Sequence, residues 1–160
     1  MKNFKLFLVF FICFIVQSTL LSHFSILGVS PNLILVLLMV FSFYFEDYSG
    51  IVFGVIFGIM QDIAFGQVIG FSAFIYFCIG MALKYVCVRV YRDNVVIMFF
   101  MAAAGTATYG FSYWLLSYML LEISFNIITV LKYIPVAAIW NFVCIMITVH
   151  FAKKIKGFTA

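Results

Sequence analysis

Long apolar runs separated by short polar turns make up the whole chain, and within these runs apolar and polar residues do not alternate at a period of two. This pattern predicts α-helices rather than the strands of a membrane barrel. We expect an all-α protein with six membrane spans, at about residues 4–24, 31–45, 49–65, 68–88, 95–118 and 134–152.

The segment 32–62 could cross a membrane once or twice, and the basic residues decide between these options, because Lys and Arg concentrate on the cytoplasmic side. With six spans and both termini in the cytoplasm, eight basic residues lie inside and only Lys132 lies outside. With five spans, at best six basic residues lie inside and three lie outside. We therefore predict a tight cytoplasmic turn at Glu46–Ser49 between two short helices.

Composition supports the membrane interpretation. The chain has 160 residues, of which 68% are hydrophobic and 9% charged, and its mean hydropathy is +1.27. Such values exclude a soluble domain and leave one membrane domain over residues 1–160. The basic residues are scattered at span ends, so no nucleic-acid partner is expected. The first span lacks an A-x-A-like cleavage site, which favours a retained helix over a signal peptide.

Glycine recurs at every fourth position in the third span. Gly50, Gly54 and Gly58 are followed at the same spacing by Asp62, and then by Gly66 and Gly70. Residues four apart lie on one face of a helix, so Gly50, Gly54, Gly58 and Asp62 form a face with little side-chain bulk, here called the glycine ridge. Each glycine costs a helix about 1 kcal/mol relative to Ala, and close approach of another helix compensates this cost. We expect Gly66 and Gly70 to shape the turn that follows.

Asp62 is the most informative polar residue of the chain. Twelve helical residues from Gly50 rise about 18 Å, which places the carboxylate in the outer half of the membrane. An acid at mid-depth costs about 2.5 to 3.5 kcal/mol, so a partner must compensate it. Two interpretations stay open. Either Asp62 accepts hydrogen bonds from Ser72, Gln67 or the backbone of the 66–70 turn, or it contacts a solute or another protein.

Other candidate sites are few. Glu46 and Asp47 form an acidic pair that is a solvated turn, a counter-charge to Arg89 and Arg92, or a contact for a basic cytoplasmic partner. His23 and His150 lie at opposite faces and cannot share a metal ion. The sequence contains no HExxH, GxSxG or Walker motif, and no second carboxylate within a span. No catalytic residue, cofactor or metal is expected.

The order of these features resembles that of the MreD family of bacterial rod shape-determining membrane proteins. The resemblance rests on the basic N-terminus, the pair Pro31-Asn32, the Gly-x3-Asp-x3-Gly-x3-Gly pattern of the third span and the basic segment 84–92. Its specific part is residues 31–92. Family members often carry a basic residue before Pro-Asn and an acid in span five. This chain has Ser30 and only Thr106, Thr108 and Ser112 there, so the resemblance gives no basis for a polar network between spans three and five.

The resemblance implies a non-enzymatic subunit of the cell-elongation machinery in the bacterial plasma membrane. Its partners would be a single-span MreC-type protein, an MreB-type actin homologue and the peptidoglycan polymerase and transpeptidase. The glycine ridge would then accept a partner's helix. The family's architecture is similar to that of substrate-binding S-components of energy-coupling-factor transporters. A vitamin-binding S-component is therefore the alternative function, although the first span has no Ala or Gly with which to meet a coupling subunit.

Overall fold

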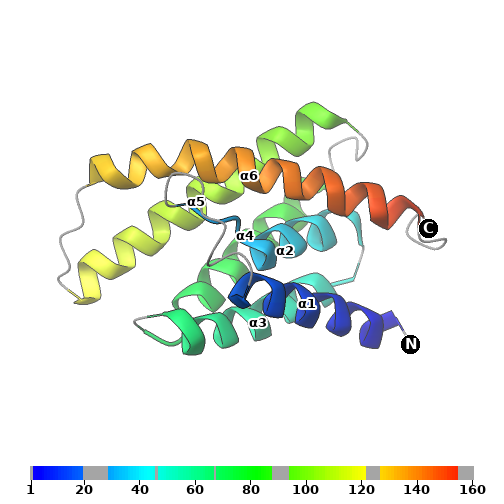
Figure 1. Cartoon of the computed structure of the whole chain (residues 1–160), viewed down its shortest axis with the longest axis horizontal. Helices are drawn as coiled ribbons and strands as arrows, with labels where there is room; N and C mark the ends of the chain where they lie inside the picture. Colours follow the sequence, from blue (N-terminus) through cyan, green and yellow to red (C-terminus); the bar gives the residue numbers. More distant parts are fainter. Residues whose placement is uncertain are drawn as a thin grey trace.

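The computed structural model describes residues 2–19, 29–45, 47–66, 68–87, 94–121 and 127–154. These residues fold into six α-helices. They are α1 (Lys2–Thr19), α2 (Leu33–Tyr44), α3 (Ser49–Phe65), α4 (Phe71–Cys87), α5 (Val95–Leu121) and α6 (Ile127–Lys154) (Figure 1). The two long helices α5 and α6 lie together on one side of the molecule. The start of α1 and the end of α6 lie at the same end of it (Figure 1).

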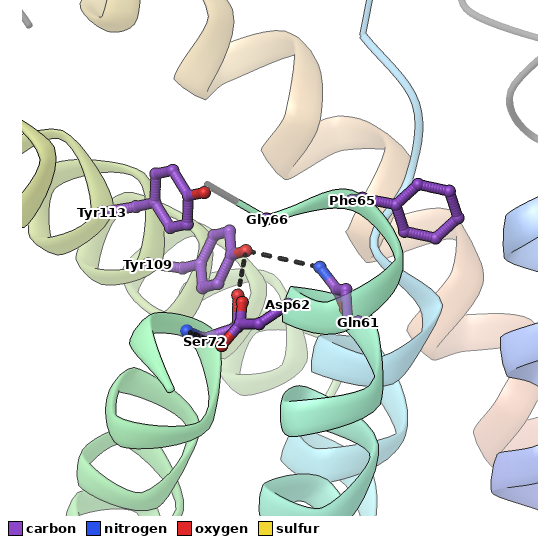
Figure 2. Close-up of a pocket in the computed structure, with 7 residues that line it drawn as sticks. All are labelled: Gln61, Asp62, Phe65, Gly66, Ser72, Tyr109 and Tyr113. Atoms are coloured by element: carbon purple, nitrogen blue, oxygen red, sulfur yellow. Dashed lines mark hydrogen bonds between the residues drawn. The ribbon is translucent and has the colours of Figure 1, made fainter. Parts of the chain in front are cut away.

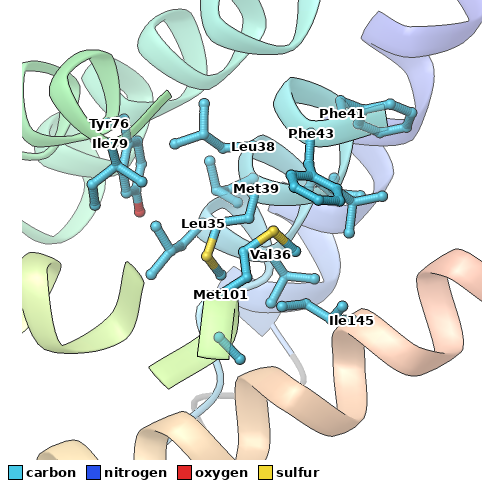
Figure 3. Close-up of a cluster of buried hydrophobic side chains, with 14 of the residues drawn as sticks. Leu35, Val36, Leu38, Met39, Phe41, Phe43, Tyr76, Ile79, Met101 and Ile145 are labelled. Carbon is cyan, nitrogen blue, oxygen red and sulfur yellow. The ribbon is translucent and has the colours of Figure 1, made fainter. Parts of the chain in front are cut away.

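Helix α2 is the centre of the fold. All residues from Ile34 to Tyr44 are buried, and α2 contacts each of the other five helices. A helix that is apolar on every side is stable only when it is surrounded. Figure 3 shows its side chains between Tyr76 and Ile79 of α4, Met101 of α5 and Ile145 of α6. The short length of α2 thus reflects a core position.

Consecutive helices run in opposite directions. Gly50 of α3 approaches Phe41 of α2, whereas Gly54, further along α3, approaches Leu38, which comes earlier in α2. The same reversal relates α3 to α4, because Gly58 approaches Ala73 while Gly80 approaches Ile51. The prediction that residues 32–62 form two helices joined by a turn is confirmed, since α2 ends at Tyr44 and α3 begins at Ser49.

The outer surface is apolar on the five helices that surround α2. Phe4 of α1, Ile63 of α3, Phe74 of α4, Phe100 of α5 and Ile139 of α6 are each more than 60% exposed. Soluble monomers rarely expose so many large apolar side chains. The segments Val95–Leu120 and Val130–Phe151 are long and apolar enough to cross a membrane, and the other four helices are shorter and apolar.

The predicted starts of the second and sixth helices are wrong. Pro31 does not open α2, which begins at Leu33 with Asn32 as its N-cap. Lys132 was assigned to a loop, but α6 already begins at Ile127 and contains it. Pro135 consequently lies inside α6. Glu122 and Asn126, between the predicted fifth and sixth spans, and residues 20–24, the predicted end of the first span, lie outside the described residues.

Candidate functional site

The glycine ridge is packed against this chain's own helices. A Cβ atom added at Gly50 would lie 2.8 Å from Phe41 Cβ, and one at Gly54 would lie 2.5 Å from Leu38 Cδ1, both on α2. A Cβ atom added at Gly58 would lie 2.9 Å from Ala73 Cα on α4. The ridge therefore lies in close contact with α2 and α4. The predicted contact of this face with a partner protein stays a prediction. Because α2 and α4 already cover the ridge, a partner's helix has no access to it.

Asp62 holds the beginning of α4. Its Oδ2 accepts hydrogen bonds from the backbone N–H groups of Gly70 and Ser72, each at 2.9 Å, and the residue is 2% exposed. Ser72 lies in the first turn of α4 and Gly70 directly precedes that helix, at the end where a helix has unpaired donors and a positive dipole. Asp62 thus acts as an N-cap supplied by the neighbouring helix. The interpretation in which backbone donors of the turn compensate the carboxylate is confirmed by this geometry.

The two glycines of the turn have separate roles. Gly66 ends α3 by donating its N–H to the Asp62 carbonyl at 2.8 Å, and an added Cβ atom would lie 2.7 Å from that same oxygen. Gly70 has φ of +104°, a backbone conformation that disfavours side chains, and its carbonyl accepts the first α4 bond from Phe74 N. Both glycines are required for the chain to reverse direction next to Asp62. Gln67, between them, lies outside the described residues.

Polar side chains of α3, α4 and α5 meet beside Asp62 (Figure 2). Gln61 Nε2 donates to Tyr109 Oη at 3.4 Å, and Tyr109 Oη is 3.1 Å from Ser72 Oγ. Tyr76 Oη donates to Gln61 Oε1 at 2.9 Å. A hydrogen-bonded connection between the third and fifth helices therefore exists, and it could not be predicted from the sequence. It uses Tyr109 rather than the threonines and serine that we considered.

The connection continues across the bundle to the remaining helices. Asn32 Nδ2 donates to Tyr76 Oη at 2.7 Å, and Asn141 Oδ1 of α6 accepts from the backbone N–H of Asn32 at 3.0 Å. Asn141 Nδ2 then donates to Thr106 Oγ1 of α5 at 2.9 Å. In α1, Gln17 Oε1 accepts from Ile34 N at 3.3 Å. Every helix thus contributes to polar contacts at one end of the bundle, where each buried polar group needs a partner.

A cavity of about 180 Å³ lies next to Asp62. It is lined by residues of the α3 end, the α4 start and α5, namely Gln61, Asp62, Phe65, Gly66, Ser72, Tyr109 and Tyr113 (Figure 2). One carboxylate, the hydroxyl groups of Ser72, Tyr109 and Tyr113, and the two tyrosine rings therefore border a single space, whereas the Phe65 ring points away from it (Figure 2). This is the one place in the described residues where a buried acid borders a cavity.

The opposite end of the bundle holds the predicted acidic turn. Asp47 Oδ1 accepts a hydrogen bond from Ser49 Oγ at 2.6 Å. Lys84 Nζ donates to the Phe45 carbonyl oxygen and lies 5.7 Å from the centre of the Tyr48 ring. A cation from α4 thus binds the carbonyl end of α2, which is favourable for the helix dipole. Glu46, Arg89 and Arg92 lie outside the described residues, so the contacts proposed for them stay predictions.

The sequence analysis identified Asp62 and the glycines but missed five polar residues of the site, namely Asn32, Gln61, Tyr76, Tyr109 and Asn141. The Asn and Gln residues among them could have been found, because an amide side chain within an apolar segment requires a buried hydrogen-bond partner. Within the described part of the chain, no group of three or more His, Cys, Asp or Glu residues could hold a metal ion. Cys13, Cys78 and Cys144 are free thiols.

Comparison with known families gives one clear match. Residues 1–155 match the model of the family described as rod shape-determining protein MreD. No curated protein and no solved structure matches the chain. The match covers nearly all of the 160 residues. The chain therefore belongs to the MreD family, a family of membrane proteins that determine rod shape.

Proposed function

We propose that this protein is a non-enzymatic scaffold subunit of the bacterial cell-elongation complex. In this proposal all six helices cross the plasma membrane, both termini are cytoplasmic, and an MreC-type single-span protein binds the bundle. That binding supports peptidoglycan synthesis by the polymerase and transpeptidase, together with an MreB-type actin homologue. Membership of the MreD family is the observation that carries this proposal.

The apolar outer surface supports the membrane placement. Helices α1, α3 and α4 expose large apolar side chains, as do the two long helices α5 and α6, so the outside of the bundle is suited to a lipid environment. Short helices of 12 to 18 residues can be accommodated by local thinning of the bilayer. The central helix α2 is shielded by the others and needs no lipid contact of its own.

The packing of the glycine ridge restricts where a partner's helix can bind. Because α2 and α4 occupy the ridge, a foreign helix can reach α3 only on its opposite side. There Val52, Ile56 and Ile59 are 53%, 41% and 39% exposed. We therefore place the partner contact on this outer stripe of α3, with the ridge fixing the position of the helix.

Mass spectrometry of proteins that co-purify with the tagged protein from gently solubilised native membranes tests the proposal. We expect a single-span shape protein and cell-wall synthases. The double variant Ile56→Ala/Ile59→Ala should reduce their recovery. The matched control Phe74→Ala/Phe77→Ala, on the exposed side of α4, should not. Recovery of paired ATPases and a coupling membrane subunit would instead support the S-component alternative.

The cavity beside Asp62 bears on that alternative. Pockets for drug-sized ligands usually enclose about 300 to 1,000 Å³. The cavity of about 180 Å³ is smaller than this range. Its volume therefore favours the scaffold function over binding of a whole vitamin.

A further inference from the structure

The cavity beside Asp62 has the chemistry of a small cation site. We propose that it binds a primary ammonium group, supplied either by the ethanolamine headgroup of a phospholipid or by a free small amine. The proposal goes beyond the scaffold function and does not depend on it. It rests on the buried carboxylate, on the hydroxyl and aromatic groups around it, and on the size of the space.

The Asp62 carboxylate has an unused acceptor. Both hydrogen bonds from Gly70 and Ser72 go to Oδ2, and Oδ1 accepts none from the described residues. No lysine or arginine of the described chain forms an ion pair with Asp62, although the residue is only 2% exposed. The two donors are neutral amides, so the negative charge of a buried carboxylate is only partly compensated. A cation in the adjacent cavity would complete this compensation.

The other lining groups favour a primary ammonium over other cations. Ser72 Oγ can accept a hydrogen bond in addition to its contact with Tyr109 Oη, which already accepts from Gln61 Nε2. Together with Asp62 Oδ1 it offers two acceptors to the N–H donors of a primary ammonium group. A quaternary ammonium cannot donate to either of them.

Two tyrosine rings border the same space. Tyr109 and Tyr113 line it with ring centroids 5.9 Å apart, whereas the Phe65 ring points away from them (Figure 2). Aromatic faces attract a cation that lies within about 6 Å of the ring. No basic side chain is among the lining residues. The negative carboxylate and the absence of a cation in this lining oppose binding of a phosphate or carboxylate ligand.

The volume and the surroundings of the cavity limit the ligand. A space of about 180 Å³ holds more than one water molecule and is of a size that suits an aminoethyl group. Phe65, which lines the cavity, is 59% exposed, and the nearby residues Ile63 and Ile69 are 65% and 67% exposed. A phospholipid could therefore place its headgroup in the cavity while its acyl chains lie on apolar surface.

Two binding assays on the full chain distinguish the two sources. In the first, the protein is purified from nanodiscs containing equal amounts of phosphatidylethanolamine, phosphatidylcholine and phosphatidylglycerol with identical acyl chains. Native mass spectrometry then measures the lipid retained. In the second, lipid-depleted protein in detergent is heated with ethanolamine or with choline. Preferential retention of the ethanolamine lipid indicates the lipid source. A rise in the unfolding midpoint with ethanolamine and not with choline indicates the free amine.

Variants connect the binding to the cavity. Asp62→Asn keeps an oxygen acceptor for Gly70 and Ser72 but removes the charge, and it should weaken binding about a hundredfold because the cation loses its charged partner. Tyr113→Leu removes one aromatic wall and should weaken binding about fivefold. Asp47→Asn, the same substitution in the turn at the opposite end, should have no effect.

The same measurements can overturn the proposal. Equal retention of the three lipids by the wild-type protein, together with no effect of ethanolamine on the unfolding midpoint, would show that the cavity is not an ammonium site. Binding by Asp62→Asn and Tyr113→Leu as strong as that of the wild type would place any ammonium site elsewhere. The scaffold proposal is judged independently, by co-purification.

Discussion

Replacing Gly58 by alanine tests whether the ridge glycines hold α3 against α4. The new Cβ atom would lie 2.8 Å from Tyr76 Cδ2, 2.9 Å from Ala73 Cα and 3.0 Å from Ala73 N. Two of these three atoms belong to the α4 backbone, which cannot rotate away as a side chain can. The helices must therefore separate by a few tenths of an ångström.

The expected magnitude is the difference between two effects. Overpacking a tight interface costs typically about 1–3 kcal/mol. Alanine improves helix propensity over glycine by about 1 kcal/mol. We therefore expect Gly58→Ala to lower the free energy of unfolding by about 1 kcal/mol, and Gly58→Leu to lower it by more.

Gly110→Ala provides the matched control. Its added Cβ atom would meet only the flexible side chain of Ile134, at 3.3 Å from Cγ1 and 3.6 Å from Cδ1. The gain in helix propensity should then dominate, so this variant should be as stable as the wild type or more stable by up to about 1 kcal/mol. The free energy of unfolding of both variants is measured by circular dichroism while dodecyl sulfate is titrated into mixed micelles. Equal stability of Gly58→Ala and Gly110→Ala would refute the packing argument.

Three further substitutions probe the polar contacts by the same unfolding assay. Asp62→Ala leaves the N–H groups of Gly70 and Ser72 without their acceptor and should cost about 2–4 kcal/mol, more than Asp62→Asn; equal effects would contradict the capping role. Asn32→Ala removes the N-cap of α2 and the bond to Tyr76, with an expected loss of about 2 kcal/mol that Asn32→Asp should partly restore. Lys84→Met keeps the apolar stem but removes the bond to the Phe45 carbonyl, and should cost about 1 kcal/mol; no change would show that the carbonyl is solvated instead.

Much of the fold follows from local pattern. Apolar runs with polar interruptions are sufficient to predict helices, and α3 was predicted at residues 49–65, the bounds it has in the structure. The separation of α2 from α3 required only the charged turn and the distribution of lysine and arginine. Boundaries failed where the chain continues as helix through polar residues, as at Lys132, because a helix can extend beyond its apolar segment.

The candidate site could be predicted only in part. The spacing of Gly50, Gly54, Gly58 and Asp62 is a property of a single helix, and this local periodicity was enough to show that one face lacks bulk. It could not show which helix fills that face. The partners of Gly58 on α4 and of Gly54 on α2 were found only from the structure.

The sequence by itself determined the helical class, the membrane character, the glycine ridge and the need of Asp62 for a partner. Each of these depends on composition or on residues within one helix. Only the tertiary structure decided that α2 is central, that Asp62 caps α4, and that Tyr109 joins Gln61 and Ser72. Those contacts join residues from eight to 48 positions apart. They depend on how each helix is rotated and how deeply it packs against its neighbours, and the local hydrophobic pattern does not determine either.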